Sequence, residues 1–395
     1  MTLRRDFLIK APLGLLAAGT AATTAISASA QTGTAPPPGA PPTFGAMPAA
    51  GPEVTPATFA EAEKLMRVTM TPAQRTLAAR SWRVSMAAMQ ERRTGPNKLA
   101  IADKVAPATV WRPLASGVNL QSAARFIRSS DAPALPALDA DIAFAPVTHL
   151  SRWIAARQLS SERLTRIYLE RIARLDGKLR SVITVTLDHA IARARQADAE
   201  IAAGKYRGPL HGIPYGVKDL LDTAGIATTW GAEPMRNNVP ARDSAVVARL
   251  NAAGAVLIAK LSLGALALND IWFGGQTMNP WLLEEGASGS SAGPGAATAA
   301  GLVGFSIGSE TGGSIVSPSM RCGVTGLRPT YGRVARNGAM TLCWSLDKLG
   351  PMTRGVEDAM LVLAAINGSD KDDVASVDVP LAFDAGGAVR GLKIG

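Results

Sequence analysis

Cysteine and histidine are scarce in this sequence, which contains two Cys and three His among its 395 residues. The histidines His149, His189 and His211 and the cysteines Cys322 and Cys343 show no close spacing. Zinc and iron sites need several such ligands at short, characteristic separations. We therefore expect no metal centre, and no residue pattern points to any other cofactor.

Charged and aromatic residues are also few, at 18% and 5% of the chain, whereas apolar residues make up 47%. This composition is typical of a globular protein and excludes a disordered one. The formal net charge of +10 comes from scattered Lys and Arg, with no basic cluster interleaved with aromatic residues. A nucleic-acid-binding face would have such a cluster. We therefore expect no nucleic-acid partner.

The sequence lacks a long hydrophobic run near its N-terminus. The apolar stretch at 11–22 is interrupted by a proline and a glycine and is shorter than the roughly 20 residues of a membrane anchor. Arg4 and Arg5 precede it, and Ala28-Ser29-Ala30 follows. This pattern resembles a twin-arginine signal peptide over residues 1–30, which predicts export to the periplasm or the cell exterior and no stable membrane span afterwards. Such proteins fold in a reducing cytoplasm, so a disulfide between the two cysteines is possible but not expected.

Prolines and composition divide the rest of the chain. Eight prolines in residues 31–58 predict an irregular linker. Apolar residues at helical spacing between Phe59 and Arg93 predict one or two helices within an N-terminal helical extension, 59–141. Strands then alternate with helices, which predicts one α/β domain over 142–395, with a central mixed, largely parallel sheet covered by helices on both sides. Gly391 to Gly395 resembles the start of a further strand, so we expect this domain to be cut short at its C-terminus.

Hydrophobic periodicity and turn residues predict the first elements of this domain. Serines at helix starts and glycines after helix ends set the expected boundaries. The expected elements are a helix capped by Ser160 or Ser161 and ended by Gly177, a strand at 182–185, an Ala-rich helix up to Gly204, a strand at 213–217, a helix at 244–253 and a strand at 255–259.

Glycine and serine crowd two loops, Gly289-Ser290-Ser291 and Thr311-Gly312-Gly313-Ser314. Glycines at this density let successive backbone N–H groups point into one small space, which suits a developing negative charge. A flexible Gly/Ser linker is the alternative interpretation. The Ala-rich stretch and the apolar run between the loops predict a buried helix and strand, which argues against a linker.

A serine nucleophile needs an adjacent base. All three histidines precede both serine loops, whereas an α/β-hydrolase has its histidine after the nucleophile. A lysine can replace histidine where burial keeps its amine neutral. Lys218 ends the apolar run 211–217 and is followed by Asp219. Taken alone, Lys218 could equally be a strand-end lysine that reaches solvent.

Three segments in this order and spacing together resemble the amidase signature family: residues 211–219, 289–291 and 311–315. The resemblance continues through residues 276–281, 322–333 and 350–354, and covers the chain from about Ile142 onward. It implies a hydrolase that cleaves the C–N bond of a small-molecule carboxamide through a serine acyl-enzyme, without a cofactor.

The resemblance also implies a role for each residue of a Ser-Ser-Lys relay. Ser314 would be the nucleophile, Ser290 the bridging serine after a cis peptide bond, and Lys218 the base. Ser290 would pass the proton of Ser314 to neutral Lys218 and return it to the departing amine. The oxyanion hole would be formed by the backbone N–H groups of Thr311, Gly312, Gly313 and Ser314.

The sequence departs from the family pattern beside the nucleophile loop. Many relatives have Asp where this chain has Glu310 and Arg where it has Val316, so both members of an expected ion pair have changed. The three catalytic groups remain, but the packing behind Ser314 is expected to differ. Ala292 and Pro294 also replace the small or polar residues usual after the bridging serine, which could reshape the leaving-group side.

Other motifs are incomplete. G-x-S-x-G occurs around Ser291 and Ser306 without a later histidine, and the S-x-x-K at 345–348 lacks its K-T-G and S-D-N companions. Residues 293–298 fall one residue short of a dinucleotide fingerprint. Alternative functions are an inactive or incomplete amidase fragment, an esterase with the same site, and a transamidating component that modifies charged transfer RNA, against which the export signal argues. Nothing in the sequence specifies the oligomeric state.

Overall fold

The computed structural model describes residues 51–66, 68–94, 98, 125–130, 133–387 and 391. The chain divides into two compact units, 1–105 and 106–395. The expected export signal and all but Gly391 of the expected last strand lie outside the described residues. Within the described ranges, no helix combines the length and apolar character that crossing a membrane requires.

In the first unit, the structure places two helices, α2 (Pro56–Met66) and α3 (Pro72–Thr94), where the periodicity predicted one or two. Each begins with proline, which suits a first helical position because its missing N–H would have no intrahelical partner there. Since α2 starts at Pro56, the last residues of the expected linker are helical. Glu63 of α2 is buried and accepts bonds of 2.6 and 2.7 Å from the Arg75 guanidinium of α3.

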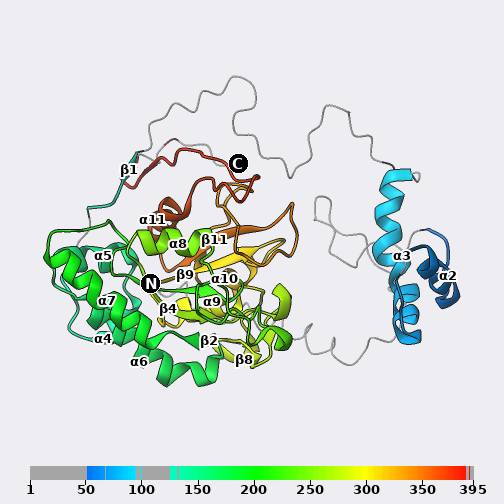
Figure 1. Cartoon of the computed structure of the whole chain (residues 1–395), viewed down its shortest axis with the longest axis horizontal. Coiled ribbons are helices and arrows are strands. Elements are labelled where there is room, and N and C mark those ends of the chain that lie inside the picture. The colour runs from blue at the N-terminus through cyan, green and yellow to red at the C-terminus, as the bar shows by residue number, and fades with distance from the viewer. Residues whose placement is uncertain are drawn as a thin grey trace. The chain divides into compact units, whose positions relative to one another are not determined.

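A six-stranded sheet in the order β10-β11-β9-β3-β4-β2 forms the centre of the second unit (Figure 1). The pairs β9/β3 and β3/β4 are parallel, whereas β10/β11, β11/β9 and β4/β2 are antiparallel. The predicted mixed sheet is confirmed, but parallel pairing is confined to β9, β3 and β4. The sequence did not predict this, because periodicity does not show a strand's direction. The strands are β2 (Val182–Val185), β3 (Pro214–Lys218), β4 (Val256–Leu261), β9 (Phe305–Glu310), β10 (Thr325–Gly326) and β11 (Lys348–Thr353).

Helices flank this sheet, with α11 at its upper side and α6 and α7 at its left and lower left in the view of Figure 1. Ser160 caps α6 as predicted, its Oγ accepting a 3.0 Å bond from the Arg163 N–H. Gly177 does not end α6, because Arg180 adopts the left-handed conformation at the C-cap (φ 52°). The helices are α4 (Asp139–Phe144), α5 (Val147–Ala155), α6 (Ser161–Leu179), α7 (Leu187–Ala202), α8 (Ala245–Ala252), α9 (Ala292–Ala299), α10 (Val316–Cys322) and α11 (Val356–Ile366).

Short elements complete the unit. The expected helical extension is not wholly helical, because β1 (Phe126–Ile127) lies within it and pairs in parallel with β12 (Phe383–Asp384). Two small antiparallel pairs and two 3₁₀ turns lie between β3 and α9. They are η1 (Glu233–Met235), η2 (Ala265–Ala267), β5 (Ile271–Trp272), β6 (Gly275–Gln276), β7 (Met278–Asn279) and β8 (Leu282–Gly286).

The hydrophobic core surrounds the central strands. Every residue of β3 and β4 is buried, and the Tyr215 ring of β3 stacks on Phe305 of β9 at 5.2 Å between centroids. Lys218 is the last residue of β3. Lys218 therefore lies in the interior of the domain, at the end of a fully buried strand.

Candidate active site

Lys218 is fully buried and lies within a cluster of serine hydroxyls. Its Nζ is 2.8 Å from Ser290 Oγ, 3.0 Å from Ser291 Oγ and 2.9 Å from Ser309 Oγ. These contacts exclude the alternative of a strand-end lysine that reaches solvent. The two sequence-predicted residues Lys218 and Ser290, which are 72 positions apart, are in direct contact.

Burial holds the pKa of Lys218 well below its ordinary value, although the charges of Asp347 and Glu310 act in the opposite direction. A neutral amine has two N–H donors and one lone pair, so one of its three hydroxyl neighbours must donate to it. Ser291 is already engaged, because its Oγ donates to the Ser309 carbonyl at 3.0 Å. The lone pair is therefore left for the hydroxyl hydrogen of Ser290 or Ser309.

The Ser290 loop is held by a close backbone approach. The Gly289–Ser290 peptide bond is cis, as the family resemblance implied. A Cβ at Gly289 would overlap the Asn269 carbonyl oxygen, so only glycine fits there. Ser290 is 1% exposed. Its hydroxyl is thus fixed in the buried cluster by the loop's backbone.

Ser314 lies in the turn between β9 and α10 and is half-buried. Its carbonyl accepts a 3.1 Å hydrogen bond from the Ser291 N–H, which ties the two serine loops together. In the part of the chain that the structure describes, its hydroxyl makes no hydrogen bond, to Ser290 or to any other group. Catalytic hydrogen bonds are often long in unliganded enzymes and shorten when substrate binds.

The loop before Ser314 offers free hydrogen-bond donors. Among the described residues, the backbone N–H groups of Gly312, Gly313 and Ser314 donate no hydrogen bond. Gly313 has φ +117°, a conformation that favours glycine. Thr311 is anchored instead through its side chain, which donates a 2.5 Å bond to Asp347. Adjacent unpaired N–H groups can stabilise an oxyanion.

Glu310 supports this loop from the interior. Its Oε2 accepts bonds of 2.8 and 2.9 Å from the N–H groups of Ile315 and Val316. Its Oε1 lies 3.2 Å from the Arg328 guanidinium. Arg328 therefore supplies the cation that many relatives have at position 316. Glu310 still anchors the backbone behind Ser314.

A cavity of about 230 Å³ adjoins the cluster. Ser309 and Thr311 line it, and so do four charged side chains, Asp347, Arg336, Asp372 and Asp373. Its apolar wall is formed by Leu220, Ala267, Met340, Leu342, Trp344 and Leu349. A ligand in this cavity would lie beside both the lysine cluster and the nucleophile loop.

Three contributors to the site were not identified from the sequence: Ser309, Arg328 and Asp347. Only Ser309 could have been identified from the sequence, because side chains two residues apart on a strand lie on the same face. Counting back from Thr311 along β9 places Ser309 on the same side. Arg328 and Asp347 come from later segments, and no local pattern connects them to Ser314.

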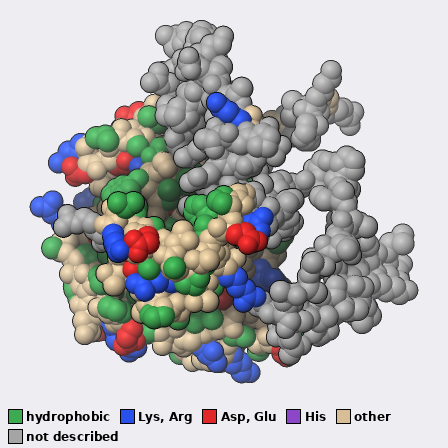
Figure 2. All heavy atoms as spheres, turned by 90° about the vertical axis from the view of Figure 1, so that its right-hand side faces the viewer, with side chains coloured by type: hydrophobic (Ala, Val, Ile, Leu, Met, Phe, Trp, Pro, Cys, Tyr) green, Lys and Arg blue, Asp and Glu red, His purple; other side chains and the backbone are tan. Residues whose placement is uncertain are grey.

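The remaining candidate groups are used elsewhere. His211 is buried, with Nδ1 accepting a bond from the Arg207 N–H and Nε2 3.2 Å from Glu200. Cys322 and Cys343 are free thiols, and burial raises the pKa of Cys322 to about 12. On the face in Figure 2, Lys and Arg lie among acidic and hydrophobic side chains without forming a continuous basic patch.

Comparisons with known proteins identify relatives of this chain. The chain is 44% identical over 244 residues to the A subunit of a glutamyl-tRNA(Gln) amidotransferase from Roseiflexus sp., covering 60% of this chain and 50% of that protein. It is 42% identical to the peptide amidase of Stenotrophomonas maltophilia, with a TM-score of 0.57, covering 59% of this chain and 50% of that one. For a fatty acid amide hydrolase the identity is 27%, the TM-score 0.58, and the coverage 63% and 45%.

Each of these alignments covers about half of the matched protein. The chain spans about half the length of the curated relatives it matches. The family described as Amidase matches residues 163–395, a range that contains the lysine, both serine loops and the cavity. The chain therefore belongs to the amidase family.

Proposed function

We propose that this protein hydrolyses the C–N bond of a small-molecule carboxamide through an acyl-enzyme on Ser314. The observation that carries the proposal is the buried Lys218 amine, 2.8 Å from the Ser290 hydroxyl. A desolvated amine is neutral more readily than an exposed one and can accept a proton. The family match and the peptide amidase among its relatives support an amide as substrate.

In the proposed acylation, Ser314 Oγ attacks the carbonyl carbon and its proton passes to Ser290 Oγ, while the Ser290 proton passes to Lys218 Nζ. The tetrahedral oxyanion accepts hydrogen bonds from the free N–H groups of Gly312 and Gly313, with Thr311 and Ser314 as the further predicted donors. The C–N bond then breaks, and the leaving amine takes its proton back through the same relay.

In deacylation, water replaces the amine. It attacks the ester carbonyl of the acyl-enzyme and gives its proton to the relay, and the C–O bond to Ser314 breaks as the proton returns to its oxygen. The products are a carboxylic acid and an amine or ammonia. No metal or cofactor takes part in these steps.

The proposal is tested by incubating the purified protein with a panel of primary and substituted carboxamides. Release of ammonia or amine, together with a mass increase on the Ser314 peptide after rapid quenching, would support it. A cooperatively folded protein that releases neither product and gains no mass from a fluorophosphonate would overturn it.

We also propose export by the twin-arginine route, on the pattern of Arg4, Arg5 and Ala28-Ser29-Ala30. Replacing both arginines with lysine should retain the protein in the cytoplasm at its uncleaved mass, because the route depends on the arginine pair. Cell fractionation and intact-mass measurement would check this. As a control, Lys10→Arg should still be exported, and export of the double-lysine variant would contradict the proposal.

Glu310 offers a test of the nucleophile loop. Glu310→Ala leaves the N–H groups of Ile315 and Val316 without their acceptor, and each unpaired buried group costs about 1–3 kcal/mol. We expect a clear fall in the free energy of unfolding and in kcat, measured by denaturant titration and initial rates. Arg328→Met is the comparison variant, because it removes only the ion pair and keeps both N–H contacts of Glu310, so we expect a smaller fall in kcat. Equal losses in both variants would show that the ion pair, not the N–H contacts, anchors the loop.

A further inference from the structure

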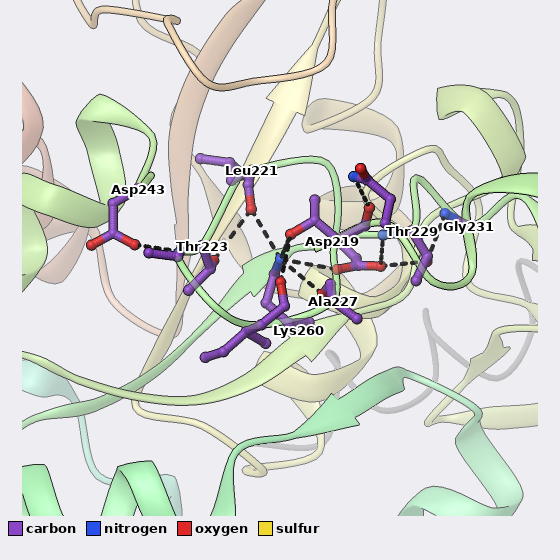
Figure 3. Close-up of polar contacts among 12 residues, drawn as sticks. Asp219, Leu221, Thr223, Ala227, Thr229, Gly231, Asp243 and Lys260 are labelled. Atoms are coloured by element: carbon purple, nitrogen blue, oxygen red, sulfur yellow. Dashed lines mark hydrogen bonds and ion pairs between the residues drawn. The ribbon is translucent and has the colours of Figure 1, made fainter. Parts of the chain in front are cut away.

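A second buried lysine lies one strand from the catalytic cluster. Lys260 of β4 and Asp219, the residue after Lys218, are both fully buried, with Lys260 Nζ 3.0 Å from Asp219 Oδ1 (Figure 3). The ammonium also donates to the Leu221 carbonyl at 3.0 Å and to Thr228 Oγ1 at 2.6 Å. A longer contact, 3.5 Å, reaches the Ala227 carbonyl. The amine of Lys260 therefore has three hydrogen-bond acceptors and one ion-pair partner, Asp219.

Asp219 is itself held on several sides. Its Oδ2 accepts bonds of 2.8 and 2.5 Å from the N–H and hydroxyl of Thr229. Its backbone N–H donates to the Leu261 carbonyl at 2.9 Å, and its carbonyl accepts a 3.0 Å bond from the Trp230 N–H. The residue that follows Lys218 therefore has little freedom as long as its carboxylate is paired.

The pair and the catalytic cluster lie on opposite faces of the sheet. Lys260 is the register partner of Val217, and Leu261 is the partner of Lys218. Successive side chains of a strand point to opposite faces. Lys260 and Asp219 therefore meet on one face, while Lys218 extends from the other face toward Ser290. Figure 3 shows the ammonium enclosed by the segment from Asp219 to Gly231.

The same segment carries the cavity wall. The Leu220 carbonyl accepts a 2.9 Å bond from the Met340 N–H, and the N–H of Asp222 donates to the Gly338 carbonyl at 2.8 Å. Leu220, Gly338 and Met340 all line the cavity beside the site. The segment that Lys260 contacts thus also forms one side of the proposed substrate cavity.

We propose that Lys260, paired with Asp219, is a positioning residue that keeps the Lys218 amine within hydrogen-bonding distance of Ser290, Ser291 and Ser309. This inference rests on the proposed amide hydrolysis. Lys260 acts through the backbone at Asp219 and does not touch the reacting atoms. Loss of the pair lets the end of β3 shift, which lengthens the proton path between Ser290 and Lys218.

The test compares the native full-length chain with the double variant Asp219→Asn/Lys260→Met, which removes both charges and leaves no unpaired buried ion. The asparagine side chain in this variant still offers an oxygen to Thr229. In a crystal structure of the variant, we expect Lys218 Nζ to lose at least one of its contacts, now 2.8 to 3.0 Å, with the three serine hydroxyls.

A kinetic comparison separates positioning from stability. An amide leaving group needs a proton from the relay, whereas p-nitrophenolate leaves without one. For substrates with the same acyl group, we expect kcat for the amide to fall roughly ten-fold more than kcat for the p-nitrophenyl ester. Ile201→Ala, a core change in α7, is the matched control and should lower both rates equally, through the folded fraction.

Unchanged Lys218 contacts, or equal losses for amide and ester in the double variant, would overturn the inference. If that variant does not fold, Thr229→Val decides. It removes the 2.5 Å hydroxyl bond to Asp219 and the 3.2 Å bond from the Gly231 N–H, leaves the ion pair in place, and should shift the same amide-to-ester ratio by a smaller factor. A native chain that hydrolyses neither substrate would instead disprove the proposed function, and the Lys218 distances would still decide whether Lys260 positions it.

Discussion

Ser314→Ala is expected to abolish acyl-enzyme formation and to lower kcat for amide hydrolysis by about 10³-fold or more. The variant removes the only atom that can form the ester, while the loop backbone, held by Glu310 and by the Ser291 N–H, stays in place. Initial rates with a carboxamide and mass spectrometry after fluorophosphonate treatment would measure both effects. The small residual rate would come from substrate binding and the free N–H groups of the loop.

Ser345→Ala is the matched control for this variant. Ser345 is exposed and begins the incomplete S-x-x-K motif that ends at Lys348. Since neither residue contacts Lys218, we expect native activity and native labelling. Loss of labelling in Ser345→Ala with retention in Ser314→Ala would place the nucleophile at Ser345 and overturn the assignment.

The sequence was sufficient where one local pattern carried the information. The strand at 182–185 was predicted with the boundaries observed, because a short apolar run between turn residues is a local signal. Lys218 and Ser290 could be paired because the family motifs name both, although spacing alone says nothing about a contact across 72 positions. The buried helix and strand between the serine loops followed from composition and are confirmed as α9 and β9.

The sequence was insufficient where contacts form between distant segments. Arg328 follows β10, which β11 separates from β9 in the sheet, and yet it reaches Glu310 at the end of β9. Strand order cannot be read from periodicity. Gly177 was a reasonable prediction for the end of α6. The helix instead ends before Arg180, which adopts the left-handed conformation although this is sterically unfavourable for a non-glycine residue. The Asp219–Lys260 pair was missed because a lysine in an apolar run gives no indication of its partner.

The pH dependence of hydrolysis should follow the protonation of Lys218. Burial lowers the pKa of this amine, and only its neutral form can accept the proton from Ser290. We therefore expect kcat/KM to be constant at high pH and to fall about ten-fold per pH unit below the Lys218 pKa, well under the ordinary lysine range. Lys218→Met should lower kcat by roughly 10²- to 10⁴-fold and remove this acid limb.

Asp347→Asn tests the assignment of Lys218 as the base, because it should shift the pKa of Lys218 in a known direction. The negative charge of Asp347 favours the protonated amine and so raises the pKa of Lys218. The single amide oxygen of the introduced asparagine can accept from Thr311 or from the N–H groups of Leu342 and Cys343, so the charge is lost together with one of these two contacts. The acid limb should then move to lower pH, with the amine neutral over a wider range. An acid limb that stays in place in Asp347→Asn, or persists in Lys218→Met, would assign the titration to another group and remove Lys218 as the base.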